Sequence, residues 1–225
     1  MTTVCEKGKC TGCMECIDIC PKKAIKIIDS WTEYNAVIDS KQCIQCNACH
    51  DACQNNVKQV LTKPIYWKQG WAHDDRIRMS SSSGGVAAAI EQAFIKNGGL
   101  VCSCTFNVGK FEFDFAESED EVGKFTGSKY VKSNPEGVYK KILENLKLGR
   151  KVLFVGLPCQ VSAVRHYTRN YQNLYTVDLI CHGTPSPKIL DSFLSDYGIQ
   201  LTEVQSIRFR EKDNFKLEQN GKRFA

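Results

Sequence analysis

Two runs of four cysteines constrain the fold of this chain more than any other feature. The first run is Cys10-x2-Cys13-x2-Cys16-x3-Cys20, and its spacing returns as Cys43-x2-Cys46-x2-Cys49-x3-Cys53. The N-terminal residues MTTVCEKGKC contain no apolar stretch of the kind found in a secretory signal. We therefore expect a cytoplasmic protein, in which thiols stay reduced and serve as metal ligands rather than as disulfides.

The spacing of both runs resembles that of the bacterial two-cluster ferredoxins. Three cysteines at x2 intervals allow one tight loop to place thiolates on three corners of an iron–sulfur cube. The fourth cysteine is expected to open a short helix and face away, and the resemblance implies that it ligates the other cluster. The predicted ligands of [4Fe-4S] cluster 1 are Cys10, Cys13, Cys16 and Cys53, and those of [4Fe-4S] cluster 2 are Cys43, Cys46, Cys49 and Cys20.

Zinc is the main alternative to iron and sulfide. Structural zinc uses two separated cysteine pairs around one tetrahedral ion, so two runs of four disfavour it. Pro21 closes the first run but has no counterpart in the second, where Gln54 follows Cys53. Cys5 lies outside both runs and is interpreted as a free thiol, with an alternative ligand as the second reading.

A β-hairpin is predicted between the runs, because residues 24–39 alternate apolar and polar side chains around a polar turn. These features predict an α+β ferredoxin-like two-cluster domain over residues 1–62. Residues 63–79 are a predicted linker, in which Trp67 and Trp71 either pack between domains or anchor the loop.

Beyond the linker, helical and strand patterns alternate, which predicts an α/β domain over residues 80–225. One helix is expected to hold Pro135 in its first turn and to end at Gly149. Asn220-Gly221 predicts a type I′ hairpin just before the last residues, so we expect this domain to be truncated. Helices are expected within 80–99, 134–149, 157–167 and 186–198, and strands within 100–106, 110–118, 151–156, 174–181 and 204–211.

Five stretches of this region resemble the beta-subunit family of coenzyme F420 hydrogenase/dehydrogenase. They are SSSSGGV (80–86), FTGSKYVKS (125–133), VLFVGLPCQVSAVRHY (152–167), VDLICHGTPSP (177–187) and IRFREK (207–212). The resemblance implies a flavoprotein, usually with FAD. It also implies that electrons pass between iron–sulfur clusters and a reducible substrate, in either direction.

Three loops are the predicted flavin-binding segments. Ser80 to Gly85 precede a helix, where hydroxyls, glycine backbone and N–H groups suit a pyrophosphate, although a plain loop and N-cap explain a serine run equally well. The loop around Gly127 resembles the family's second cofactor loop. The predicted cofactor-binding residues are Ser82, Ser83, Gly84, Gly85, Gly127, Ser128, Lys129, Tyr130, Gly156, Pro158, Cys159 and Gln160.

Three residues are candidates for catalysis. Cys159 is expected at a helix N-terminus, which lowers the pKa of a thiol. Lys129 is suited to neutralise phosphate or a reduced flavin, and His182 is a candidate proton donor or a loop histidine. Cys159 and Cys181 are assigned to the redox site, whereas Cys102 and Cys104 are read as buried structural cysteines, and a third cluster of all four is the alternative.

Together these features predict an iron–sulfur flavoprotein oxidoreductase. Its partners would be a redox protein or oxidoreductase subunits and a small-molecule electron donor or acceptor. The alternatives are an electron carrier without activity of its own and an inactive truncated product.

The net charge of +5 is not gathered into a long basic stripe, so a nucleic-acid partner is not expected. No apolar run is long enough for a membrane span. Lysines near the cysteines either compensate cluster charge, dock an acidic partner or form a solvated face.

Overall fold

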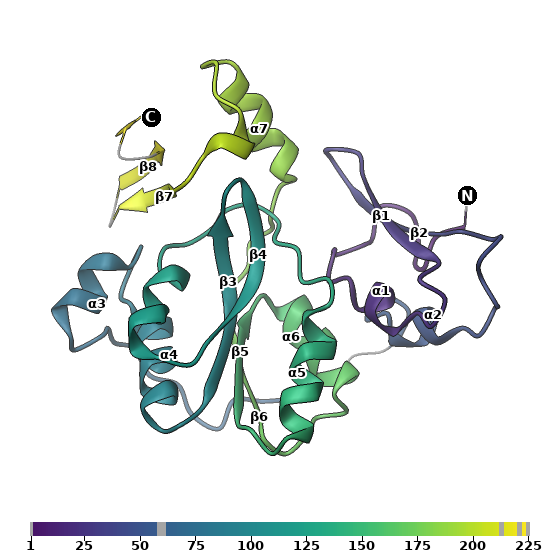
Figure 1. Cartoon of the computed structure of the whole chain (residues 1–225), viewed down its shortest axis with the longest axis horizontal. Helices are drawn as coiled ribbons and strands as arrows, with labels where there is room; N and C mark the ends of the chain where they lie inside the picture. Colours follow the sequence, from purple (N-terminus) through teal and green to yellow (C-terminus); the bar gives the residue numbers. More distant parts are fainter. Residues whose placement is uncertain (1, 58–61, 212–213, 220–221, 224–225) are drawn as a thin grey trace.

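The computed structural model of the chain describes residues 2–57, 62–211, 214–219 and 222–223. A small N-terminal part with two short helices and a hairpin lies on one side of a larger part built around a sheet (Figure 1). The turn residues Asn220 and Gly221 lie outside the described residues, although the strands that flank them pair as the sequence predicted.

The hairpin of the N-terminal part lies where alternation predicted it. β1 (Ile25–Asp29) pairs antiparallel with β2 (Tyr34–Ile38). The N-terminal segment runs alongside β2, since Thr3 bridges Val37 and the Val4 N–H donates to the Ala36 carbonyl at 2.9 Å.

The fourth cysteine of each run ends a helix, so the expectation that it opens one is wrong. α1 (Glu15–Ile19) stops immediately before Cys20, and α2 (Ala48–Ala52) stops immediately before Cys53. Each helix contains the third cysteine of its run, Cys16 in α1 and Cys49 in α2. Because a helical turn is 3.6 residues, the third and fourth thiols of a run are separated by about one turn.

Four strands form the sheet of the α/β part, in the order β4-β3-β5-β6. β4 is antiparallel to β3, whereas β5 and β6 are parallel to it. The carboxyl ends of the parallel strands therefore share one edge, which is where open α/β sheets bind ligands. The strands are β3 (Leu100–Asn107), β4 (Lys110–Ala116), β5 (Val152–Gly156) and β6 (Leu174–Asp178).

Helices cover both faces of this sheet (Figure 1). α5 (Val138–Lys147) and α6 (Pro158–Tyr167) pack on the face that carries Leu100 and Cys102, while α4 (Val86–Lys96) and the 3-10 helix η1 (Glu119–Phe125) pack on the face that carries Val101. Successive residues of β3 enter opposite layers because side chains alternate across a strand.

Two local predictions differ from the structure. Pro135 precedes α5 instead of lying in its first turn, because Gly137 forms the N-cap with φ 78°. The predicted linker contains a helix, α3 (Asp75–Ser80), whose N-cap side chain, that of Asp74, accepts hydrogen bonds from the Arg76 and Ile77 N–H groups. Trp67 and Trp71 are both exposed.

The last elements follow β6, and the three strands among them form a separate sheet in the order β7-β8-β9. They are α7 (Pro187–Ser195), the 3-10 helix η2 (Leu201–Glu203), β7 (Ile207–Glu211), β8 (Asn214–Gln219) and β9 (Lys222–Arg223). Within the described residues, no helix has the length and apolar character that crossing a membrane requires.

Candidate iron–sulfur and cofactor sites

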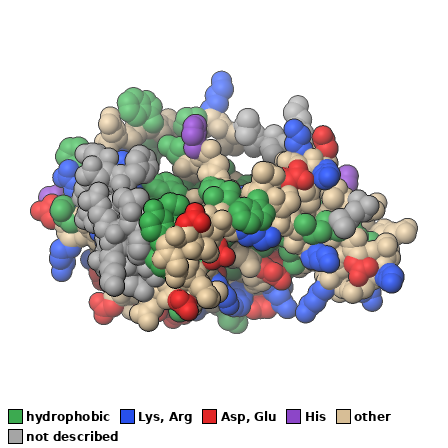
Figure 2. Space-filling model, turned by 90° about the horizontal axis from the view of Figure 1, so that it is seen from above, with side chains coloured by type: hydrophobic (Ala, Val, Ile, Leu, Met, Phe, Trp, Pro, Cys, Tyr) green, Lys and Arg blue, Asp and Glu red, His purple; other side chains and the backbone are tan. Residues whose placement is uncertain are grey.

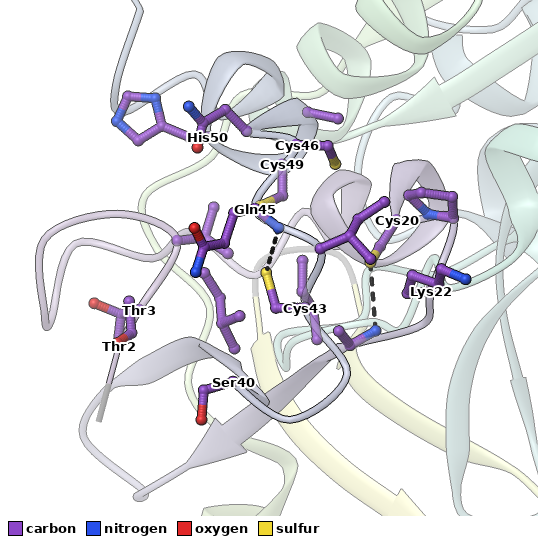
Figure 3. A pocket seen from close by; sticks show the side chains of 18 residues that line it. Thr2, Thr3, Cys20, Lys22, Ser40, Cys43, Gln45, Cys46, Cys49 and His50 are labelled. Carbon is purple, nitrogen blue, oxygen red and sulfur yellow. Dashed lines mark hydrogen bonds between the residues drawn. The ribbon is translucent and has the colours of Figure 1, made fainter.

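The four cysteines assigned to cluster 2 line one pocket of about 430 Å³ at the edge of the N-terminal part. Figure 3 shows Cys20, Cys43, Cys46 and Cys49 around this pocket, with Lys22, Ser40 and His50 at its border. Backbone N–H groups already point at two of the sulfurs, from Ala24 to Cys20 Sγ at 3.3 Å and from Gln45 to Cys43 Sγ at 3.4 Å. Such N–H groups suit a cluster whose sulfurs accept hydrogen bonds.

The arrangement of the thiols fits the crossed assignment. Burial raises the pKa of Cys49, backbone hydrogen bonds oppose that shift, and the charges of Cys20 and Cys43 raise the pKa further. The fourth cysteine of the first run therefore lies close to the second run. At the other site burial raises the pKa of Cys16, and the charges of Cys13, Cys10 and Cys53 raise it further. Each fourth thiol thus lies near the opposite run, as the crossed assignment requires, and that assignment stays a prediction.

The donor set of the cluster 2 pocket fits a four-iron cube. Cys20, Cys43, Cys46 and Cys49 surround one volume of about 430 Å³, and four thiolates on the corners of a cube are the ligand set of a [4Fe-4S] cluster. Across the part of the chain that the structure describes, no group of three His, Cys, Asp or Glu side chains is placed to hold a single metal ion.

Burial favours the protonated form of two cluster 1 thiols, Cys13 and Cys16, by raising their pKa values. It raises the pKa of Cys13 to about 11, against weaker opposing hydrogen bonds. Ligand thiols must deprotonate to bind metal, so assembly of cluster 1 releases protons and becomes easier as pH rises.

The cluster 1 loop is held by the α/β part through hydrogen bonds to its backbone. The buried Tyr139 hydroxyl on α5 donates to the Cys13 carbonyl at 2.7 Å, and the Lys132 ammonium donates to the Thr11 carbonyl at 2.8 Å. Gly12 permits this approach, because its φ is +71° and a Cβ there would lie 2.7 Å from Lys132 Cδ. The loop that carries cluster 1 is therefore part of the interface between the two parts.

Gln54 connects this interface to one predicted flavin loop. Its side-chain amide donates to the Cys159 carbonyl at 3.1 Å and to Thr11 Oγ1 at 3.4 Å. Cys159 packs against the same core cluster that contains Cys13. Cluster 1 and the start of α6 therefore lie next to each other.

Two of the predicted flavin loops are joined directly. The Ser128 N–H donates to the buried Ser82 hydroxyl at 2.8 Å. Ser83, Ser128 and Tyr130 are exposed beside this contact, and Gly127, with φ +80°, has open space where a side chain would extend. The loops therefore present polar groups and accessible backbone near the edge of the sheet where ligands bind.

The remaining predicted loop residues are held within the protein. Gly84 lies against Trp71, because a Cβ on Gly84 would stand 3.3 Å from Trp71 Cβ, and Gly85 is the N-cap of α4 with φ 75°. Gly156 ends β5 and is buried, whereas Pro158 is exposed at the first position of α6. The buried Gln160 amide donates to Ser133 Oγ at 2.9 Å.

Lys129 points into the protein. Its ammonium donates to the carbonyls of Phe125 and Thr126 at 2.7 and 3.3 Å. Burial lowers its pKa, while the charges of Cys104 and Glu91 oppose that shift. Sequence reasoning missed Glu91, which α4 carries into the interior, where burial raises its pKa to about 7 against a hydrogen bond from Ser103 and the charge of Lys129.

The expected low pKa of Cys159 is wrong. The residue lies in the first turn of α6 as predicted, but burial raises its pKa, and this outweighs the opposing charge of Lys132. Cys181 acts electrostatically on Cys159, so the two thiols are neighbours, and both Cys181 and His182 are exposed.

Cys102 and Cys104 instead face the core beneath α5 and α6. Cys102 is fully buried there, and Cys104 is partly buried against the same cluster. This is the environment expected of structural cysteines.

Comparisons with known proteins match the two parts separately. Residues 9–57 match the 4Fe-4S dicluster domain, and residues 149–224 match the C terminus of the coenzyme F420 hydrogenase/dehydrogenase beta subunit. The predicted resemblance is confirmed. The chain thus holds one segment similar to the dicluster ferredoxins and one similar to these beta subunits.

Two curated proteins are similar in sequence. The Uncharacterized protein MJ1349 of Methanocaldococcus jannaschii is 22% identical, and the match covers 91% of this chain and 68% of that protein. The Ferredoxin-type protein NapH of Haemophilus influenzae is 29% identical over 62 residues, which cover 27% of this chain and 22% of that protein.

One solved structure is similar in fold. A chain of the F420-reducing [NiFe] hydrogenase complex from Methanosarcina barkeri matches with a TM-score of 0.52 and 22% identity. The match covers 67% of this chain and 55% of the solved chain, so this chain spans little more than half the length of that solved protein.

Proposed function

We propose that this protein is an oxidoreductase that passes electrons between its two clusters and a two-electron substrate through bound FAD. The observation that carries the proposal is the position of cluster 1. Its loop is held by Tyr139 and Lys132 of the α/β part, and Gln54 joins it to Cys159 in a predicted flavin loop. A flavin accepts one or two electrons and so joins single-electron clusters to two-electron chemistry.

The two clusters have distinct positions in this proposal. Cys13 is buried in the core formed with α5 and α6, and Cys16 is buried within the N-terminal part, whereas Cys46 is exposed. Cluster 2 therefore exchanges electrons with a partner at the surface, and cluster 1 exchanges them with the flavin site. Figure 2 shows basic and acidic side chains interspersed over the end of the molecule that holds the N-terminal part, so the charge does not favour a strongly acidic or basic partner.

The chain's own residues would hold the flavin at the carboxyl edge of the sheet. Ser83, Ser128 and the backbone at Gly127 would bind phosphate, with the N-terminus of α4 adding N–H groups. His182 would supply a proton, because it is exposed beside Cys181. The interior position of Lys129 gives it a supporting role through the backbone of its loop rather than direct contact with phosphate.

The wider setting belongs to the same proposal. The partners would be subunits of an oxidoreductase or a redox protein, together with a small-molecule donor or acceptor. A cytoplasmic location follows from the need to keep the cluster thiols reduced.

Flavin binding tests the proposal directly. The chain is reconstituted anaerobically with iron and sulfide, incubated with FAD and gel-filtered, and we expect bound FAD in proportion to protein. Gly127→Asp should abolish binding by placing a carboxylate beside the phosphate. Gly149→Asp is the matched control, because Gly149 has φ +79° and open space but lies at the end of α5. Equal FAD retention by both variants, or none by the unaltered chain, would contradict the proposal.

An electron carrier without activity is the second candidate, and one observation favours it. Ser82 accepts its hydrogen bond from Ser128, and the Lys129 ammonium is bonded to backbone carbonyls, so two predicted phosphate-binding groups already have partners. This alternative is supported if the reconstituted chain exchanges electrons through both clusters but retains no FAD.

A further inference from the structure

A fifth thiol lies at cluster 1. Cys5 is outside both cysteine runs, yet it is buried, and the ionisable groups that act on it are the predicted ligands Cys53 and Cys10. Val4, the residue before Cys5, packs in the same small core as Cys10, Cys16 and Cys53. Asn55, two residues after Cys53, directs its side-chain amide at Cys5 Sγ at 3.9 Å and at the Lys9 carbonyl at 2.8 Å.

The backbone around Cys5 is fixed, so this proximity is built into the fold. The Val4 N–H donates a hydrogen bond to the Ala36 carbonyl of β2 at 2.9 Å, and the Val4 carbonyl accepts a hydrogen bond from the Asn56 side-chain amide at 2.9 Å. Thr3 Oγ1 donates to the Cys5 carbonyl at 2.6 Å. The segment before Cys5 therefore lies against both the hairpin and the residues that follow Cys53.

The internal repeat gives an independent reason to place position 5 beside a cluster. Cys5 precedes the first run by the same number of residues as Ile38 precedes the second run, since 10 − 5 equals 43 − 38. Ile38 lines the cluster 2 pocket together with Cys20. The two repeats thus share a position at the wall of their clusters, and only the first fills it with a thiol.

We propose that Cys5 is a reserve ligand of cluster 1 that can replace Cys53 at one iron. The exchange needs no electron transfer. An iron–sulfur bond to Cys5 Sγ forms as the bond to Cys53 Sγ breaks, and the proton that the Cys5 thiol releases is taken up by the departing Cys53 thiolate. The inference rests on the crossed assignment, in which Cys53 belongs to cluster 1, and it predicts that only cluster 1 tolerates loss of its fourth ligand.

Equivalent variants in the two repeats test this. Cys53→Ala and Cys20→Ala each remove a fourth ligand. After anaerobic reconstitution, iron and sulfide analysis should show that Cys53→Ala keeps both clusters, with an altered EPR signal from cluster 1, while Cys20→Ala loses one. Cys5→Ala alone should keep both. The double variant Cys5→Ala/Cys53→Ala should lose cluster 1.

The proposal is overturned if Cys53→Ala loses a cluster as completely as Cys20→Ala, or if the double variant keeps as much iron as Cys53→Ala. Failure of the crossed assignment would look different, because Cys20→Ala would then remove the EPR signal that Cys13→Ala also removes. Should Cys53→Ala not fold, the transplant Ile38→Cys decides. In the Cys20→Ala background it should restore the second cluster, and unchanged iron content would overturn the proposal.

Discussion

The two cysteine runs share one spacing but occupy opposite environments. Residues 12–16, around Cys13, are all buried, whereas residues 44–47, around Cys46, are all exposed. The difference comes from α5 and α6, which contact α1 and supply Tyr139 to the Cys13 carbonyl. A sequence repeat therefore predicts the ligands of both clusters, while the rest of the fold decides which run is exposed and which is buried.

Removing a fourth ligand should have the largest effect, the loss of one cluster. Which cluster is lost tests whether the fourth cysteine of each run serves the opposite run. Cys20→Ser should damage the cluster held by Cys43, Cys46 and Cys49, because Cys20 lines their pocket. EPR of the reduced protein should lose the signal of the exposed cluster, and that of Cys13 and Cys16 should persist. Loss of the signal that Cys13→Ser also removes would show that each run holds its own cluster.

Removing one hydrogen bond should affect the buried cluster alone. Tyr139→Phe leaves the Cys13 carbonyl buried without its donor, which should cost about 1–3 kcal/mol of unfolding free energy. The reduction potential of cluster 1 should also change, because the loop that orients its thiolates is released. Tyr66→Phe, at an exposed residue of the segment before α3, is the control. Equal changes in both potentials would remove the distinction between the clusters.

The pH dependence of stability should reach cluster 1 through the α/β part. The folded pKa of Glu91 is raised to about 7 from 4.5, so the folded state binds the proton more tightly and loses this stabilisation as pH rises through 7. Relative to Glu91→Gln, the unaltered chain should be about 1 kcal/mol less stable at pH 8 than at pH 6.

Anaerobic denaturant titrations at the two pH values measure this difference. Loss of cluster 1 should follow the unfolding of the α/β part more closely than loss of cluster 2 does. If the difference in unfolding free energy between the unaltered chain and Glu91→Gln is the same at both pH values, Glu91 keeps an ordinary pKa.

A surface charge beside cluster 2 should have the smallest effect. Lys22→Glu places a negative charge at the border of the exposed pocket, which should slow reduction of cluster 2 by dithionite a few-fold through charge repulsion. Reduction by the methyl viologen radical cation should not slow. Stability should change by less than about 0.5 kcal/mol, since the residue is exposed. A matched slowing with both reductants would point to altered cluster structure.

Much of the fold was predictable because it depends on local patterns. The hairpin of β1 and β2 follows from alternation, and the buried strand β5 follows from a short apolar run. The predictions that failed depend on cap geometry. Cys20 ends α1 because its backbone is extended, with φ −73° and ψ 112°, and α5 begins after Gly137 because that residue is left-handed. Spacing and composition carry no direct record of those dihedral angles.

The candidate site was predictable in its residue types but not in its contacts. Ligand spacing is a local property, so the sequence was enough to predict the cysteines of both clusters. The contacts of Tyr139, Lys132 and Gln54 with cluster 1 residues or with Cys159 join positions far apart in the chain, and none of the three lies in a metal-binding motif. The Cys159 pKa failed for the same reason, since its burial comes from packing between the two parts.

The sequence by itself determined the two cysteine repeats and the resemblance of the following region to the F420 hydrogenase beta subunits, and both segments match the expected families. Only the tertiary structure decided that Cys13 is buried against α5 and α6 and that Cys5 lies near Cys10 and Cys53. Ligand spacing depends only on residues close together in the chain, so it can be seen in the sequence. Burial depends on which distant segments exclude water from a site, and that is settled only when the chain has packed.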